Sequence, residues 1–176
     1  ITKYDLNPDG NIGDHYVGEK IGEIWGFVTD GFYSTDEEAA GVDNSDIWGG
    51  KWLAGDVRYK NLNGDKTADG KDIISKGHSK LQDPGDRKII GNNTARYNYG
   101  ISLSAEYKNF DFSCLMQGVG KRDLMLGGAY FWGFTDEWRT PTTEQLDYWT
   151  PDNPNAYYPR QRFGGGGNFQ SQDRKS

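Results

Sequence analysis

Residues 97–118 read YNYGISLSAEYKNFDFSCLMQG, and their apolar and polar side chains alternate with the period of two that is typical of a β-strand. Lys108 and Asn109 interrupt the alternation, which predicts two strands joined by a two-residue turn. The turn sets the register. The expected cross-strand partners are Tyr107 and Phe110, Ala105 and Phe112, Leu103 and Cys114, and Ile101 and Met116.

The hairpin has one apolar and one polar face, and its length suits either of two environments. A strand of about ten residues, at roughly 3.3 Å per residue and a tilt of about 45°, spans on the order of 24 Å. This is close to the ~25 Å apolar belt of an outer-membrane barrel, whose lumen is wet. A half-buried hairpin of a soluble sheet has the same period. The residues expected to face lipid are Tyr99, Ile101, Leu103, Ala105, Phe112, Cys114 and Met116.

If the chain is placed in water, that apolar face should not stay bare, because exposed apolar patches and open strand edges drive association. We therefore expect the aromatic side chains of the loops, or another copy of the chain, to cover it.

The composition predicts a loop-rich chain held together by aromatic clusters. Its 176 residues favour one domain. The 25 glycines are about twice the usual share of ~7%. The chain also has 6 Trp, 11 Tyr and 8 Phe, whereas disordered chains are poor in aromatic residues. The mean hydropathy of −0.87 leaves little material for an aliphatic core.

The charge and the cysteine count exclude some classes of protein. A net charge of −6 argues against nucleic-acid binding, which needs a basic surface. The single cysteine excludes an internal disulfide. No apolar run approaches the ~18 residues of a membrane helix, and no signal peptide is evident. We expect the chain to be an excerpt of a longer protein.

Shorter elements are expected on both sides of the hairpin. Glycine-punctuated alternation predicts short, bent strands in residues 16–33, and residues 56–60 predict another strand. Thr35 and Glu38 have the spacing of a capping box, so a short helix should begin there and end before Gly41.

The remaining segments read mainly as loops. Residues 61–96 read as a polar loop in which two turns flank the small apolar patch Ile89-Ile90. Two helical turns are expected from Thr142 to Trp149, closed by Pro151. The expected organisation is a loop region with short strands over 1–96, the hairpin over 97–118 and a second loop region over 119–176.

Four blocks of sequence carry a family resemblance: VGEKIGEIWGFVTDGFY, GDVRYKNLNGDK, DPGDRKIIGNNTARYNYGISLSAEYKNFDFSCLMQGVGKRD and YWTPDNPNAYYPR. Their sequences, order and spacing resemble the SusC/RagA family of TonB-linked outer-membrane proteins. The resemblance implies a barrel of about 22 strands with a plug, in the outer membrane of a Gram-negative bacterium. The expected fold is mainly β and loop-rich: one transmembrane hairpin, long extracellular loops and one or two short helices.

The same resemblance implies a function in transport. Members of the family import glycans or peptides with a SusD-like surface lipoprotein, and TonB drives the import. The plug and the TonB-contacting segment are absent from this chain. The sequence also departs from the family pattern in the stretch expected to read Asp-Leu-Asn-Gly-Asp-Gly, where Asn61 replaces the first aspartate and Lys66 the last glycine.

Residues 61–72, NLNGDKTADGKD, suggest a structural calcium site. Oxygen donors fall at positions 1, 3, 5, 7, 9 and 12, the spacing of an EF-hand loop, with Thr67 offering its carbonyl at position 7. Against calcium, Lys66 stands at position 6, where glycine is needed, and a solvated, turn-rich loop explains the same residues. The candidate ligands are Asn61, Asn63, Asp65, Thr67, Asp69 and Asp72.

Other candidate sites have weaker signals. The six tryptophans (Trp25, Trp48, Trp52, Trp132, Trp138 and Trp149) could stack on sugars or pack the loops together. Asp136, Glu137 and Asp147 resemble a glycosidase pair only in composition. His15 and His78 lack a second histidine or a cysteine for zinc, and GVGKRD at 118–123 lacks the phosphate-loop pattern. We expect no enzyme. The alternative function is a soluble glycan-binding or adhesive module.

Overall fold

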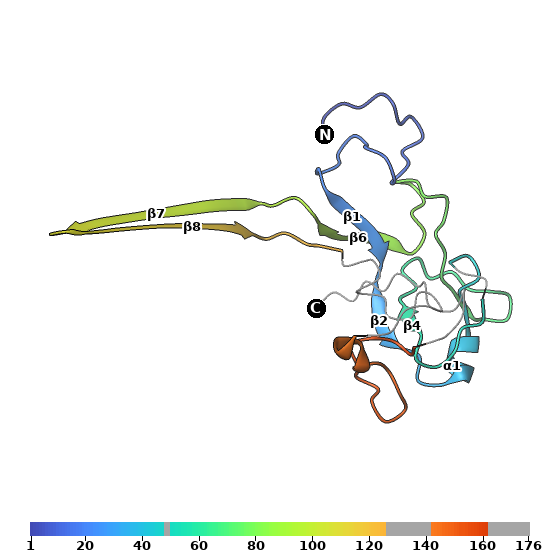
Figure 1. Ribbon diagram of the computed structural model, residues 1–176. Helices are drawn as coiled ribbons and strands as arrows, with labels where there is room; N and C mark the ends of the chain where they lie inside the picture. Colours follow the sequence, from blue (N-terminus) through green and yellow to red (C-terminus); the bar gives the residue numbers. More distant parts are fainter. Residues whose placement is uncertain (48–49, 126–141, 162–176) are drawn as a thin grey trace.

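A long two-stranded arm extends from a loop-rich body in the computed structural model, which describes residues 1–47, 50–125 and 142–161 (Figure 1). We call residues 97–120 the arm, and residues 1–47, 50–92 and 142–161 the body. Strands predominate over helix, as the sequence predicts. None of the helices in the described ranges is long and apolar enough to cross a membrane.

The arm is the hairpin predicted from the alternating sequence. Strands β7 (Tyr97–Tyr107) and β8 (Phe110–Gly120) are antiparallel, and all four expected pairs are in register. β8 runs two residues beyond the predicted end at position 118, and Gly120 pairs with Tyr97. Lys108 in the turn has a φ of 54°, in the left-handed region that few residues other than glycine adopt.

The body contains three small sheets. β1 (Glu23–Phe27) pairs with β6 (Arg87–Asn92), and β2 (Thr29–Phe32) pairs with β4 (Val57–Tyr59), both antiparallel. β3 (Val42–Asp43) and β5 (Asp72–Ile73) are parallel. The expectation that Ile89 and Ile90 form a patch within a loop is wrong, because both lie in strand β6. The segment is too short to show a period, and it becomes a strand because β1 lies beside it.

The helices are short, and one of them differs from the prediction. α1 (Asp36–Ala40) starts at Thr35, whose Oγ1 accepts the Glu38 N–H at 3.2 Å, and Gly41 caps its end, as predicted. The Glu38 carboxylate accepts the N–H of Ser34 at 2.7 Å instead of that of Thr35.

The second helix is only one 3₁₀ turn, η1 (Thr143–Leu146), and the expected two-turn helix through Trp149 is wrong. The chain leaves the helix at Asp147 and pairs with its own continuation. The Trp149 N–H donates to the Tyr158 carbonyl at 2.8 Å. A local helical pattern cannot reveal this pairing, because it depends on the turn that follows.

Aromatic side chains hold the body together, as the composition predicts. Edge-to-face contacts join Trp52 to Tyr33 and to Tyr59, with ring centroids 6.4 and 6.3 Å apart. Ala54, Trp149 and Ala156 form a second cluster, against which Phe32 packs. The buried residues of the main cluster are Tyr33, Ala39, Trp52, Val57, Tyr59 and Ile74.

Hydrogen bonds fasten the arm to the body at a neck, residues 21–22, 92–94 and 122–123. The Asn92 N–H donates to the Asp123 carboxylate at 2.8 Å, and the Asp123 N–H donates to the Asn92 carbonyl at 2.9 Å. Asn92 Nδ2 donates to the Ile21 carbonyl at 3.0 Å. The neck therefore joins the start of β7 and the end of β8 to the β1–β6 sheet.

Candidate functional site

The apolar face of the arm is exposed. The residues predicted to face lipid lie on one face of the two strands, and their larger aliphatic and aromatic members are between 43% and 60% exposed. The expectation that loop aromatics or another copy of the chain cover it stays a prediction, because the aromatic-rich residues 126–141 lie outside the described residues. The loops that the structure describes do not cover this face. The reason is geometric, because the arm extends away from the body (Figure 1).

The opposite face is mostly polar, with two exceptions that the sequence analysis did not single out. Ser102, Ser104 and Ser113 lie on it together with Leu115 and Val119. Leu115 and Val119 are 67% and 57% exposed. They have the parity of Ser113, so the alternation itself could have revealed them.

The central part of the arm carries no charged side chain, and charged side chains lie on both sides of it, at the turn and near the body. Residues 97–105 and 112–120 contain no Asp, Glu, Lys or Arg. Glu106, Lys108 and Asp111 lie at the turn, and Arg96 and Lys121 lie between the arm and the neck. The arm thus has an uncharged middle between two charged ends, a pattern that sequence reasoning missed.

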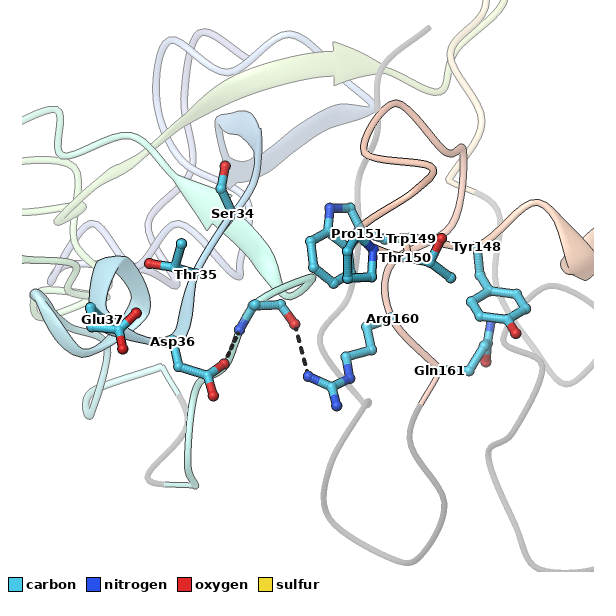
Figure 2. A pocket seen from close by; sticks show the side chains of 11 residues that line it. Ser34, Thr35, Asp36, Glu37, Tyr148, Trp149, Thr150, Pro151, Arg160 and Gln161 are labelled. Atoms are coloured by element: carbon cyan, nitrogen blue, oxygen red, sulfur yellow. Dashed lines mark hydrogen bonds between the residues drawn. The ribbon is translucent and has the colours of Figure 1, made fainter.

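A cavity of about 500 Å³ lies in the body, between segments that are far apart in the sequence (Figure 2). Ser34–Glu37 and Ala54 line one side, and residues 148–151, Arg160 and Gln161 line the other. The Ala54 main chain lies between two charged groups, because its N–H donates to Asp36 Oδ1 at 2.8 Å and its carbonyl accepts from Arg160 Nη1 at 3.4 Å.

The chemistry of this cavity suits hydrogen bonding to a polar ligand. Carboxylates of Asp36 and Glu37 can accept hydrogen bonds, the Arg160 guanidinium can donate them, and Tyr148 adds an aromatic ring. None of the lining residues is a histidine or a cysteine. The sequence analysis missed the cavity because no local pattern relates Asp36 to Arg160.

The candidate calcium ligands are brought together, but they bind one another. Asn61 Oδ1 accepts the Gly64 N–H at 2.6 Å, and Asn63 Nδ2 donates to Asp65 Oδ2 at 2.8 Å. The Lys66 ammonium lies 2.8 Å from Asp72 Oδ1, and this contact holds the pKa of the Asp72 carboxyl below its usual value. Thr67 Oγ1 accepts the N–H of Lys71, and Asp69 is exposed.

Within the described ranges, no three His, Cys, Asp or Glu side chains are grouped closely enough to hold a metal ion. Asparagine and carbonyl oxygens are also calcium ligands. The calcium site at residues 61–72 therefore stays a prediction.

Three of the six tryptophans lie in the described part of the body. Trp52 and Trp149 are buried in the two aromatic clusters, which confirms packing for this pair. Trp25 is partly buried, and its Nε1–H donates to the Tyr16 hydroxyl at 3.2 Å. Trp48, Trp132 and Trp138 lie outside the described residues.

The other candidate groups mostly have structural partners. The Asp147 carboxylate accepts from Asn153 Nδ2 at 2.9 Å and from the Tyr157 N–H at 3.1 Å. Asp136 and Glu137 lie outside the described residues. His15 Nδ1 lies 2.9 Å from Glu19 Oε2, and His78 pairs with Asp83. Residues 118–123 form the end of β8 and part of the neck.

No family model, curated protein or solved structure matches the chain.

Proposed function

We propose that this chain is part of a TonB-dependent outer-membrane importer similar to SusC, with the arm as two adjacent barrel strands and the body on the extracellular side. The single observation that carries this proposal is the arm's exposed apolar face with its uncharged middle. The sequence resemblance supports it independently.

The dimensions of the arm agree with a membrane-spanning role. Eleven residues per strand, at roughly 3.3 Å each and a tilt of about 45°, span about 26 Å. The apolar belt of an outer-membrane barrel is about 25 Å tall, and an arginine facing lipid at its middle costs about 2–4 kcal/mol. The cost of a lipid-facing charge is highest at the middle of the membrane and falls toward its surfaces. The arm, with an uncharged middle and charges at both ends, matches this pattern.

The position of the neck supports the orientation. Barrels of this class have short periplasmic turns and long extracellular loops. The two-residue turn at Lys108 and Asn109 is therefore periplasmic, and the body beyond the neck is extracellular. There its cavity is accessible to a glycan or peptide cargo delivered with a SusD-like lipoprotein. TonB acts through other parts of the protein.

A soluble glycan-binding or adhesive module is the second candidate, favoured by the polar lining of the body's cavity. In such a module, protein instead of lipid covers the apolar face of the arm.

Cysteine labelling of the full-length protein in outer membranes separates the two. Cys114 lies on the apolar face, and Ser104 lies on the opposite face. With cysteines elsewhere replaced by serine, Cys114 should react with a lipid-soluble maleimide and resist a water-soluble one. A Ser104→Cys, Cys114→Ser variant should react with a small water-soluble reagent. Equal labelling of both positions by the water-soluble reagent, or a protein that fractionates as soluble, contradicts the proposal.

A further inference from the structure

We propose that the ammonium group of Lys66 takes the place of a metal ion in the loop of residues 61–72, so that the loop folds without calcium. The loop has the oxygen spacing of a calcium site, but its sixth position carries a cation instead of glycine. The proposal concerns the loop itself and does not rest on the importer function.

The two ends of the loop meet at Lys66. Its Nζ lies 2.8 Å from Asp72 Oδ1, and Asn61 Nδ2 lies 3.3 Å from the same oxygen. Lys66 and Asp72 also form an isolated antiparallel bridge between their main chains. Asn61, Lys66 and Asp72, at positions 1, 6 and 12 of the motif, thus meet at one carboxylate oxygen. A bound calcium ion likewise holds the two ends of such a loop together.

Several of the remaining oxygens already accept hydrogen bonds from the loop or from Ile73, which follows it. Asn63 Oδ1 accepts the Asp65 N–H at 3.0 Å, and the Thr67 carbonyl accepts the Gly70 N–H at 2.9 Å. The Asp65 carbonyl accepts from Asn61 Nδ2 at 2.7 Å and from the Ile73 N–H at 3.0 Å. A calcium ion would have to displace several of these donors before it could bind.

The closed loop has a clear structural consequence. It leads directly into β5, whose Ile73 is held by the Asp65 carbonyl, and the next residue, Ile74, is buried in the main aromatic cluster. Both partners of the Lys66–Asp72 pair are about half exposed, at 58% and 46%. The pair is weak as an isolated ion pair. Its importance lies in where it closes the loop.

Thermal unfolding of the full chain tests this inference with three substitutions: Lys66→Arg, Lys66→Met and Lys66→Gly. Each protein is melted in EDTA and in calcium at about 1 mM, the weak end of the range for extracellular calcium modules. The Tm of the wild type should be the same in EDTA and in calcium, and so should the Tm of Lys66→Arg. Lys66→Met and Lys66→Gly should melt earlier in EDTA and recover part of the loss in calcium, with magnesium as the control ion.

Three results overturn the inference. A higher Tm of the wild type in calcium shows that the native loop binds the metal despite Lys66. An absence of any calcium response in Lys66→Met and Lys66→Gly shows that the ammonium does not stand at a cation position. Failure of Lys66→Met to fold in either solution also contradicts it, because calcium should then replace the lost charge.

Discussion

Gly55 lies so close to the indole ring of Trp149 that a Cβ atom at position 55 would overlap the ring. The Gly55 N–H donates to the Tyr33 carbonyl at 2.8 Å, and its carbonyl accepts the Arg160 N–H at 2.9 Å. Its φ of +85° lies in the left-handed region. Through these contacts one glycine joins the segment from 142 to 161 to the main aromatic cluster and shapes the cavity of the body.

Gly55→Ala should therefore destabilise the body by about 2–4 kcal/mol. Overpacking typically costs 1–3 kcal/mol, and the left-handed backbone adds about 1 kcal/mol for a residue with a Cβ atom. Gly64→Ala is the matched control, because Gly64 has a φ of +78° with nothing within 4 Å of the new Cβ. Urea unfolding followed by tryptophan fluorescence measures both, and equal losses would contradict the close contact with Trp149.

Asp86 should be a second strong determinant of stability. Its side chain is fully buried, and it accepts the N–H groups of Leu62 at 2.6 Å, Asn63 at 3.2 Å and Ser75 at 2.7 Å. Asp86→Ala leaves three partly buried N–H donors without their acceptor, and the expected loss is about 3 kcal/mol. Asp152→Ala, at an exposed position, should change the free energy of unfolding by less than about 0.5 kcal/mol. A small effect at Asp86 would show that water replaces its carboxylate.

The sequence predicted the parts of the fold that depend on neighbours in the chain. The arm follows from alternation and a two-residue turn, and α1 follows from Thr35 and Glu38, because each pattern is complete within its own segment. Strand β6 and the cavity beside Arg160 could not be predicted in this way. β6 exists because β1 lies beside it, and the cavity exists because Gly55 allows Trp149 to approach. Neither contact leaves a periodic signal in one sequence.

The Tyr16 phenol should give the body a distinct pH dependence. Burial, together with the hydrogen bond that Tyr16 donates to Glu23 at 2.6 Å, raises its pKa to about 12 from an ordinary value of 10.0. The folded state therefore holds this proton more tightly than the unfolded state. Its contribution is complete below about pH 10 and is lost as the pH rises toward about 12.

Tyr16→Phe removes that contribution. The free energy of unfolding of the wild type should fall more steeply than that of Tyr16→Phe between pH 10 and about 12. The other tyrosines are common to both proteins, so the difference between the two curves isolates Tyr16. Parallel curves would mean that burial and the hydrogen bond to Glu23 do not raise the pKa of the Tyr16 phenol.

In water without lipid or detergent, the chain should self-associate through the arm. Its apolar face is exposed, and no strand among the described residues pairs with the outer edges of β7 and β8. Analytical ultracentrifugation should show oligomers for the wild type. Replacing Leu103 and Phe112 together by glutamine should shift the population toward monomer, whereas Ser104→Gln on the opposite face should not. A monomeric wild type would contradict this expectation.

The assignment of the lipid-facing side makes a sharper prediction for the full-length protein. Leu103→Arg should impair barrel assembly much more than Ser104→Arg. Leu103 lies near the middle of β7, where an arginine facing lipid costs about 2–4 kcal/mol. Ser104 has the opposite parity, so its side chain enters the wet interior and a charge there stays hydrated. Because the two positions are adjacent and receive the same residue, differences in strand propensity largely cancel.

That ranking alone does not exclude a soluble core, since Leu103 would be buried there too, so Leu103→Trp provides the decisive comparison. Lipid has room for the added bulk, and the cost should be small, whereas overpacking of a soluble core typically costs 1–3 kcal/mol. Heat-modifiable migration and outer-membrane yield measure all three variants. Equal tolerance of arginine at 103 and 104 would refute the lipid-facing assignment. A severe defect in Leu103→Trp would mean that protein, not lipid, covers the apolar face of the arm.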